Sequence, residues 1–247
     1  MASPLAQFEI TKIMPLEVAG YDVSFTNSSA FMALTVVLIS LFVLGGMRQA
    51  ALVPGRWQLM VEVFYEFVAK TLTDLAGHDA RRYFPFVFSL FMFILFANVL
   101  GLMPYSFTVT SHIAVTFAMA FFVFVGVTLI GFIKHGIGFL KFFVPHGAPW
   151  YLLPLLILIE VVSYLSRPIS LSVRLFANMV AGHTMLKVFG GFVVALGALE
   201  GIWGASGIFP VAFMVAITGL ELLVACLQAY VFTVLTCIYL NDALHMH

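Results

Sequence analysis

The stretch WYLLPLLILIEVVSYLSRPISLSVRLFANMVAGHTMLKVFGGFVV, residues 150–194, decides the fold, because it is mostly apolar yet carries charged residues. A helix of these 45 residues would be about 67 Å long, whereas the hydrocarbon core of a bilayer is about 30 Å thick. We therefore expect either two membrane crossings or one long helix at a steep tilt. Arg174 stays charged, which costs roughly 3 to more than 10 kcal/mol at membrane depth. Such a charge is expected to handle another charge, so ion movement through the bilayer is the first hypothesis.

The composition indicates a membrane protein. Hydrophobic residues make up 63% of the 247 and charged residues only 9%, against about 25% charged in soluble domains. Basic and acidic residues both number 11, so net charge gives no sign of nucleic-acid binding. Cys226 and Cys237 lie about 16 Å apart along one helix, too far for a disulfide, and are expected to be small buried side chains. We expect no cleaved signal peptide in residues 1–28, which lack a basic start followed by an apolar run.

We predict an all-α polytopic membrane protein, a single membrane domain with about five membrane helices. Apolar runs long enough to span a bilayer lie at 29–47, 83–103, 112–133, 150–194 and 207–240. The organisation that we expect is an N-terminal segment outside (1–28), a first span (29–47), an amphipathic interfacial helix (54–77), a two-span hairpin (83–134) and a hairpin of two long, steeply tilted helices (150–241).

Charge placement favours five spans with both basic loops on the cytoplasmic side, the N-terminus outside and the C-terminus inside. The basic residues concerned are Arg48, Arg56, Lys70, Arg81, Arg82, Lys134 and Lys141. Splitting 150–194 into two crossings would put the C-terminus outside, and the basic loops do not exclude that alternative. In 54–77, charged residues gather mostly on one face, so we expect a helix along the membrane surface that anchors the chain or docks a partner.

Polar residues recur around Arg174 at intervals of 3, 4, 3, 4 and 4, which places them on one helix face. We call this set the Arg174 stripe: Glu160, Ser163, Arg167, Ser170, Arg174 and Asn178. A lipid-facing surface would not carry the stripe, so it must face protein, water or both. A polar seam that only joins helices is the alternative, but serines alone would serve that purpose at lower cost than two arginines and a glutamate.

His183 lies nine residues after Arg174, half a turn away on the helix surface. Glu221 and Gln228 share a face of the last apolar segment, being seven residues apart. Antiparallel packing of the two long helices would bring Glu221 near His183 and Gln228 near Arg174. A buried carboxyl next to a buried imidazole suits proton relay near neutral pH, although a lone histidine would more often be a satisfied core residue.

Several function classes lack support in the sequence. The other histidines show no zinc-site spacing, and there is no GxxxxGK[ST] or GxGxxG phosphate loop. We therefore expect no metal, no cofactor, no bound nucleotide, no nucleic-acid partner and no enzyme activity of the chain on its own. Two rival functions remain: a secondary proton or ion transporter, although the paired repeats typical of that class are not found, and a purely structural membrane subunit.

Three stretches resemble subunit a of the membrane sector of F-type ATP synthases, as does the order of segments over about residues 20–242. They are SRPISLSVRLFANMVAGH (166–183), ELLVACLQAYVFTVLTCIYL (221–240) and NVLGLMPYSF (98–107). The resemblance implies a stator channel beside a rotor ring (the c-ring) whose subunits each carry one essential carboxylate. It implies that protons reach and leave those carboxylates through two offset half-channels. Peripheral-stalk b-type subunits, the remaining ATP synthase subunits and lipid are the other implied partners.

The resemblance also implies roles for single residues. The essential arginine of the family falls on Arg174, and its channel positions fall on Asn178, His183, Glu221 and Gln228. Glu160 matches a polar position of the inner half-channel, and Ser163, Ser170 and Asn98 are added as candidates for the proton path. In much-studied bacterial members the acid and the imidazole are exchanged between the positions of His183 and Glu221. The order found here resembles alphaproteobacterial and mitochondrial members, and we expect a bacterial plasma (inner) membrane, with the mitochondrial inner membrane as the alternative.

Overall fold

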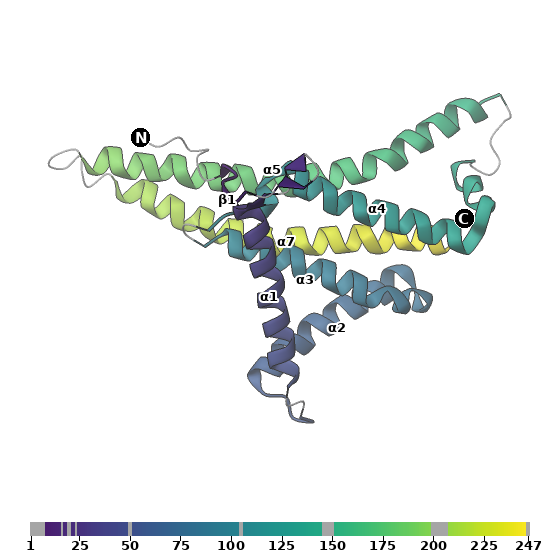
Figure 1. The fold of residues 1–247 in the computed structure, drawn as a ribbon, viewed down its shortest axis with the longest axis horizontal. Helices are drawn as coiled ribbons and strands as arrows, with labels where there is room; N and C mark the ends of the chain where they lie inside the picture. Colours follow the sequence, from purple (N-terminus) through teal and green to yellow (C-terminus); the bar gives the residue numbers. More distant parts are fainter. Residues whose placement is uncertain are drawn as a thin grey trace. The chain divides into compact units, whose positions relative to one another are not determined.

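The computed structural model of the chain describes residues 8–15, 17–18, 21–22, 24–48, 51–103, 106–144, 151–198 and 207–245 (Figure 1). Within these ranges, six α-helices follow one another: α1 (Asn27–Met47), α2 (Arg56–Ala76), α3 (Phe84–Gly101), α4 (Ile113–His135), α5 (Leu153–Gly197) and α7 (Ile208–Leu244). Five of them, all except α2, lie in helical segments long and apolar enough to cross a membrane. The prediction of an all-α polytopic membrane protein is confirmed.

The N-terminal segment contains short strands that the sequence analysis did not predict. Strand β1 (Lys12–Met14) pairs antiparallel with β4 (Phe25–Thr26), and β2 (Glu17–Val18) with β3 (Tyr21–Asp22). The first residue of α1, Asn27, fastens this segment to the helix. Its side-chain amide donates to the carbonyl oxygen of Glu9 at 3.1 Å, and its Oδ1 accepts from the backbone N–H of Thr11 at 3.2 Å.

The sequence left open whether residues 150–194 form one long helix or two crossings. In the structure, all 45 residues from Leu153 to Gly197 form one helix, α5, with Pro168 inside it. The predicted hairpin with α7 is also present. The rings of Phe189 and Phe213 are 4.5 Å apart, and His183 faces Glu221, so residues pair in the reversed order of antiparallel helices. The connection at 199–206 lies outside the described residues, and the steep tilt stays a prediction.

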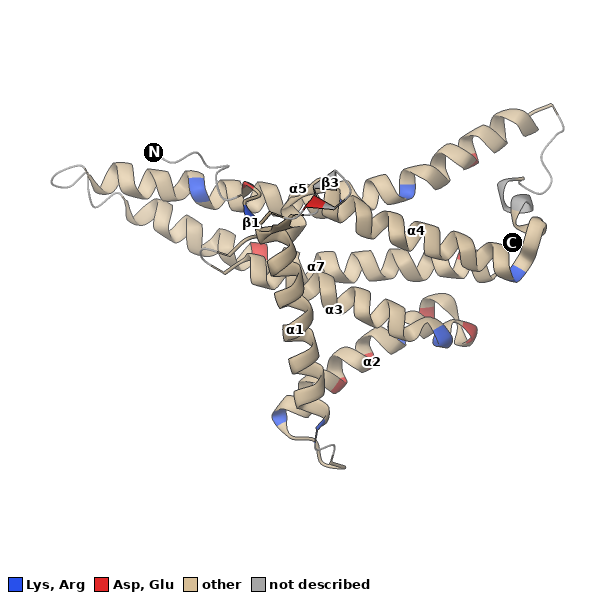
Figure 2. Ribbon diagram, viewed as in Figure 1, with Lys and Arg blue, Asp and Glu red and all other residues tan. Residues whose placement is uncertain are grey.

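The chain packs as two compact units, each built from separated segments. The first unit comprises Met1–Phe42, Met92–His112 and Leu175–Ala229, and the second comprises Val43–Phe91, Ile113–Arg174 and Tyr230–His247. Charged residues are sparse along the long helices and more frequent in and after α2 (Figure 2). This distribution is expected of helices whose backbone polar groups are satisfied internally and whose side chains meet hydrocarbon.

In the second unit, α2 is buried along one face only. Its buried residues recur at helical spacing and are Gln58, Val61, Val68, Leu72 and Ala76. Gly77 ends this helix with a φ of 75°, in the left-handed region that glycine adopts most easily, as the sequence predicts. Leu59, Val63 and Phe67 remain 41 to 54% exposed, so this helix keeps an apolar surface besides the packed one. Its place along the membrane surface stays a prediction.

A charged clamp joins the first half of α5 to the end of α7 within the second unit. The guanidinium Nη1 of Arg167 donates to a carboxylate oxygen of Asp242 at 3.0 Å. The same guanidinium lies over the rings of Tyr239 and Tyr164, at 4.8 and 5.2 Å from their centroids. Thr128 of α4 completes the clamp through a 2.7 Å hydrogen bond with the Tyr164 hydroxyl. The guanidinium thus joins α5 to α7, and the Tyr164 ring on which it lies links both to α4 through Thr128.

The clamp predicts that Asp242→Ala loosens the packing of α7. Removing the carboxylate leaves Arg167 without its anionic partner, which is expected to cost about 1–2 kcal/mol, a factor of about 5 to 30 in local opening. The rate at which the fully buried Cys237 reacts with a thiol reagent measures this opening. Cys226 is exposed, so the expectation that both cysteines are buried was wrong for it, and the background replaces it with serine. Glu66→Ala, which removes an exposed carboxylate of α2, is the control; equal labelling of the two variants would contradict the prediction.

Candidate functional site

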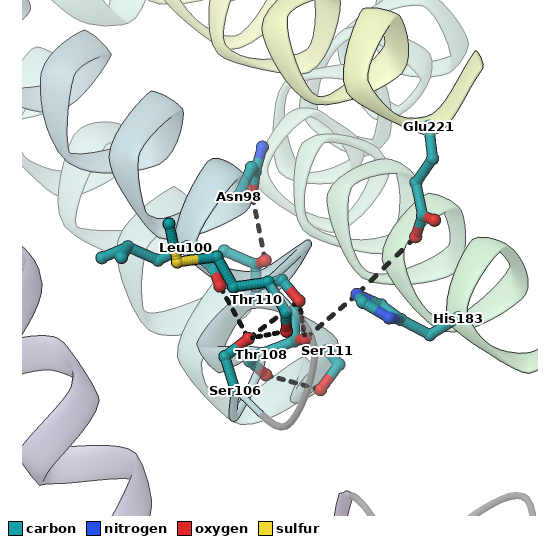
Figure 3. A network of polar contacts seen from close by, with 10 residues as sticks. Asn98, Leu100, Ser106, Thr108, Thr110, Ser111, His183 and Glu221 are labelled. Carbon is teal, nitrogen blue, oxygen red and sulfur yellow. Dashed lines mark hydrogen bonds and ion pairs between the residues drawn. The ribbon is translucent and has the colours of Figure 1, made fainter. Parts of the chain in front are cut away.

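The polar residues of the first unit converge where α5 and α7 pack together. His183 of α5 and Glu221 of α7 point toward each other (Figure 3), with 3.6 Å between Nε2 of the imidazole and Oε1 of the carboxyl. Glu221 is 2% exposed and His183 9% exposed. The predicted proximity of these two residues is confirmed.

The carboxyl group of Glu221 is buried without the usual compensation. Neither of its oxygens forms a hydrogen bond with any residue that the structure describes. An unsatisfied buried polar group costs about 1–3 kcal/mol, so buried polar groups are nearly always paired. An ionisable side chain of this kind inside a membrane-spanning helix is expected to serve a function, because its cost to stability has no structural return.

Gly182 makes the close approach of the Glu221 carboxyl possible. A Cβ placed on Gly182 would lie 2.5 Å from Oε1 of Glu221 and 2.8 Å from its carboxyl carbon. Only glycine, which has no Cβ, leaves room at position 182 for the Glu221 carboxyl. The two consecutive residues Gly182 and His183 thus provide the space for the carboxyl and the imidazole next to it. The carboxyl therefore lies against the backbone of α5, beside the ring that it faces.

His183 has a hydrogen-bond partner outside α5 and α7. Its Nε2 lies 3.0 Å from the hydroxyl oxygen of Thr108, in the segment between α3 and α4. The ring of Phe8 meets the imidazole edge to face, with 6.3 Å between the ring centroids. The imidazole is thus held from three sides, by a hydroxyl, an aromatic ring and a carboxyl.

Asn98 of α3 ties the same segment to α7. Its Oδ1 accepts a hydrogen bond from the Thr110 hydroxyl at 2.9 Å, and its Nδ2 donates to the carbonyl oxygen of Ala225 at 3.3 Å. Asn98 is fully buried. The structure thus brings Asn98 into the polar network that contains His183 and Glu221, although Asn98 does not contact either of them directly.

The Arg174 stripe has a different environment. Arg174, Ser163 and Ser170 are exposed, and Glu160, Arg167 and Asn178 are half-buried. Arg174 forms no hydrogen bond or ion pair with any other residue in the described ranges. His183, half a turn away, is buried, as expected if the stripe and the His183–Glu221 pair use opposite faces of α5. Gln228 is buried on α7, and its predicted proximity to Arg174 stays a prediction.

Sequence comparison identifies the family. The family model described as the ATP synthase A chain matches residues 29–241. The chain belongs to the ATP synthase A chain family. It is 63% identical over 243 residues to ATP synthase subunit a of Chelativorans sp., a match covering 98% of this chain and 97% of that protein. It is 61% identical to the subunit of Parvibaculum lavamentivorans (98% and 93% covered) and 60% identical to that of Paramagnetospirillum magneticum (100% of both).

The sequence analysis missed the segment between α3 and α4. Four of its six residues from 106 to 111 carry hydroxyl groups, and Thr108 and Thr110 bond directly to candidate site residues. The density of hydroxyls between two apolar helices was the available signal. Among the described residues, no group of three or more His, Cys, Asp and Glu side chains is arranged to hold a metal ion.

Gly182→Ala is predicted to lower the proton transport of an ATP synthase that contains this chain while preserving its assembly. The new Cβ displaces the flexible end of Glu221 rather than backbone, and alanine favours the helix by up to about 1 kcal/mol. ATP-driven proton pumping in membrane vesicles is expected to fall several-fold, with subunit content unchanged. Gly191→Ala is the matched control, because a Cβ there meets nothing within 4 Å. Equal pumping by the two variants would contradict the role assigned to the Glu221 position.

Proposed function

We propose that the chain is the stator proton-channel subunit of an ATP synthase, which couples proton flow to rotation and ATP synthesis. Two offset half-channels deliver protons to carboxylates of a rotor ring and receive them after the ring has turned. Arg174 stands between the half-channels and prevents a direct passage of protons. Membership of the ATP synthase A chain family supports this proposal.

The observation that carries the proposal is the exposure of Arg174 on a membrane-spanning helix without an ion-pair partner in the described chain. A guanidinium at membrane depth needs an anion or water to compensate its desolvation. A carboxylate on a neighbouring, moving subunit supplies that anion, and the arginine in turn favours the ionised form of the carboxylate. The same positive charge repels protons that would otherwise cross through water.

The remaining polar residues divide between the two half-channels. His183, Glu221, Asn178 and Gln228 line the path on one side of Arg174, and the buried Asn98 supports it. Glu160, with Ser163 and Ser170, lines the path on the other side along the Arg174 stripe. Each proton that crosses releases about 2.3 kcal/mol per 100 mV of membrane potential, which is the energy available to turn the ring.

The proposal extends to partners and location. The exposed members of the Arg174 stripe, Ser163, Ser170 and Arg174, face the rotor ring. Peripheral-stalk b-type subunits hold the chain in place, and lipid covers the apolar helix surfaces. The N-terminus lies outside and the C-terminus in the cytoplasm of a bacterial plasma membrane, because the basic loops around α2 and after α4 then lie inside. Nucleotide chemistry belongs to other subunits of the complex.

Arg174→Ala is predicted to abolish ATP-driven proton pumping and to raise passive proton leak through the assembled complex. Arg174→Lys is expected to be severely impaired as well, since it keeps the charge and loses the planar, five-donor guanidinium. Both effects are measured in inverted membrane vesicles by quenching of a pH-sensitive dye. Arg56→Ala, at an exposed arginine that begins α2, is the control. Retained coupled pumping in Arg174→Ala would overturn the proposal.

Glu221→Gln is predicted to slow proton flux by at least about tenfold, because the amide keeps the shape of the side chain but cannot take up and release a proton. The rate is measured across a range of pH in vesicles, with Glu66→Gln on α2 as the exposed-carboxylate control. A Glu221→Gln rate equal to wild type at every pH would place this residue outside the proton path.

Reconstitution separates the proposal from the rival functions. Vesicles that contain this chain without a rotor ring are expected to show no coupled transport, and transport is expected when the complete complex is present. Solute-coupled transport by the chain alone would instead indicate a secondary transporter. A structural subunit would lose assembly, rather than flux, when Arg174 is replaced by Gln.

A further inference from the structure

The imidazole of His183 faces two oxygen atoms with one nitrogen. Its Nε2 lies 3.0 Å from the Thr108 hydroxyl oxygen and 3.6 Å from Oε1 of Glu221 (Figure 3). The first distance is that of a hydrogen bond and the second is too long for a good one. In the structure, the imidazole of His183 is therefore hydrogen-bonded to Thr108, and the carboxyl of Glu221 lies beside it without a hydrogen bond.

We infer that Thr108 is a positioning residue of the proton path, whose hydroxyl orients the His183 ring so that Nε2 stays within reach of Glu221. This inference rests on the function proposed above and adds to it a residue from the segment between α3 and α4. The ring nitrogens of a histidine are distinguished by their hydrogen bonds, so a fixed partner on Nε2 determines how the ring presents its proton.

The Thr108 hydroxyl can serve His183 in both of its protonation states. It lies 3.2 Å from the carbonyl oxygen of Gly101 as well as 3.0 Å from Nε2. When Nε2 carries no hydrogen, the hydroxyl donates to it. When Nε2 carries a hydrogen, Nε2 donates to Oγ1 and the hydroxyl turns to donate to the Gly101 carbonyl. The Thr108 hydroxyl can therefore stay hydrogen-bonded to Nε2 whether or not Nε2 carries a proton. A side chain that could only donate, or only accept, would lose this hydrogen bond in one of the two states.

Hydrogen bonds within the first unit fix the position of residues 106–111, the segment that contains Thr108. The Ser106 hydroxyl oxygen lies 2.6 Å from the carbonyl oxygen of Leu100, in the last turn of α3, and 2.7 Å from that of Met103 just after it, so its one hydrogen can be donated to either. Such carbonyls have no partner within the helix and need one from outside. The Ser111 hydroxyl donates to the carbonyl oxygen of Thr108 at 2.6 Å, which fixes the backbone next to the proposed positioning residue.

Gly101 permits Thr108 to lie against α3. A Cβ on Gly101 would be 2.7 Å from the methyl carbon of Thr108 and 3.0 Å from its hydroxyl oxygen. The charged or titratable groups that act on His183 are Glu221 from α7 and Lys187, one turn further along α5. The 106–111 segment contributes hydroxyls, and the N-terminal segment contributes the Phe8 ring. A neutral hydroxyl thus completes a site whose other polar members change charge.

A comparison of Thr108→Ser with Thr108→Ala tests the inference in the complete ATP synthase. The two variants lack the same methyl group and differ in the hydroxyl alone, so a packing role affects both equally. We expect Thr108→Ser to pump protons within about twofold of wild type. We expect Thr108→Ala to be slower by about three- to tenfold, the effect of one lost hydrogen bond. We also expect its pH profile in vesicles to be displaced by about half a unit, since the ring exchanges protons in a changed environment.

Thr35→Val is the control for the loss of any buried hydroxyl, because Thr35 of α1 is 1% exposed and, among the described residues, its hydroxyl bonds only to the Phe31 carbonyl of its own helix. This control is expected to keep the wild-type rate and pH profile. Equal rates and equal pH profiles for Thr108→Ser and Thr108→Ala would overturn the inference. Arg174→Ala, measured in parallel, keeps the two proposals separate: its loss of pumping upholds the proposed function even where Thr108 proves irrelevant.

Discussion

The constraint on which the structure depends is that hydrocarbon offers no hydrogen bonds. Each backbone polar group in a membrane-spanning segment must find its partner inside the protein, and the five candidate spanning segments of the described chain are all helices. The same constraint makes every polar side chain informative. The guanidinium of Arg167 is paired with a carboxylate and lies over two aromatic rings, and the Ser106 hydroxyl can donate to the Leu100 carbonyl in the last turn of α3. The carboxyl of Glu221 is buried without a hydrogen bond, and the exposed guanidinium of Arg174 has no ion-pair partner among the described residues, so both depart from this pattern.

These two exceptions differ in the kind of partner that they require. Glu221 is enclosed, so whatever bonds to it must be as small as a proton or a water molecule, or must be His183 after a small movement of the ring. Arg174 is exposed, so its partner can be another protein. The half-turn between positions 174 and 183 separates the two requirements on opposite faces of one helix. The proposed proton path, which ends at a carboxylate on a moving subunit, needs both an enclosed titratable group inside the chain and an exposed positive charge at its surface.

The sequence predicts this part of the structure well because the relevant signals are local. Apolar run lengths predict the spanning helices, and the spacing of Arg174 and His183 predicts their different faces. The facing of His183 and Glu221 follows once the two long helices are assumed antiparallel. The partners of these residues could not be predicted in the same way. Asp242 meets Arg167 across 75 positions, and Thr108 meets His183 across the same separation, and no periodicity within a helix encodes such pairings.

Two positions near the site require glycine because a Cβ atom there would clash with a site residue. Gly182 leaves room for the Glu221 carboxyl, and Gly101 leaves room for Thr108. Glycine inside a helix is destabilising by about 1 kcal/mol relative to alanine, so helix propensity alone would not place it at position 182, in the middle of α5; Gly101 is the last residue of α3. The packing explains both: one glycine brings the acid to the imidazole and the other brings the hydroxyl to the same ring. The distances from Nε2 of His183 to Glu221 and to Thr108 therefore depend on how closely those residues can approach the backbone at Gly182 and Gly101. The geometry of the proposed relay is thus determined by helix packing as well as by the titrating side chains.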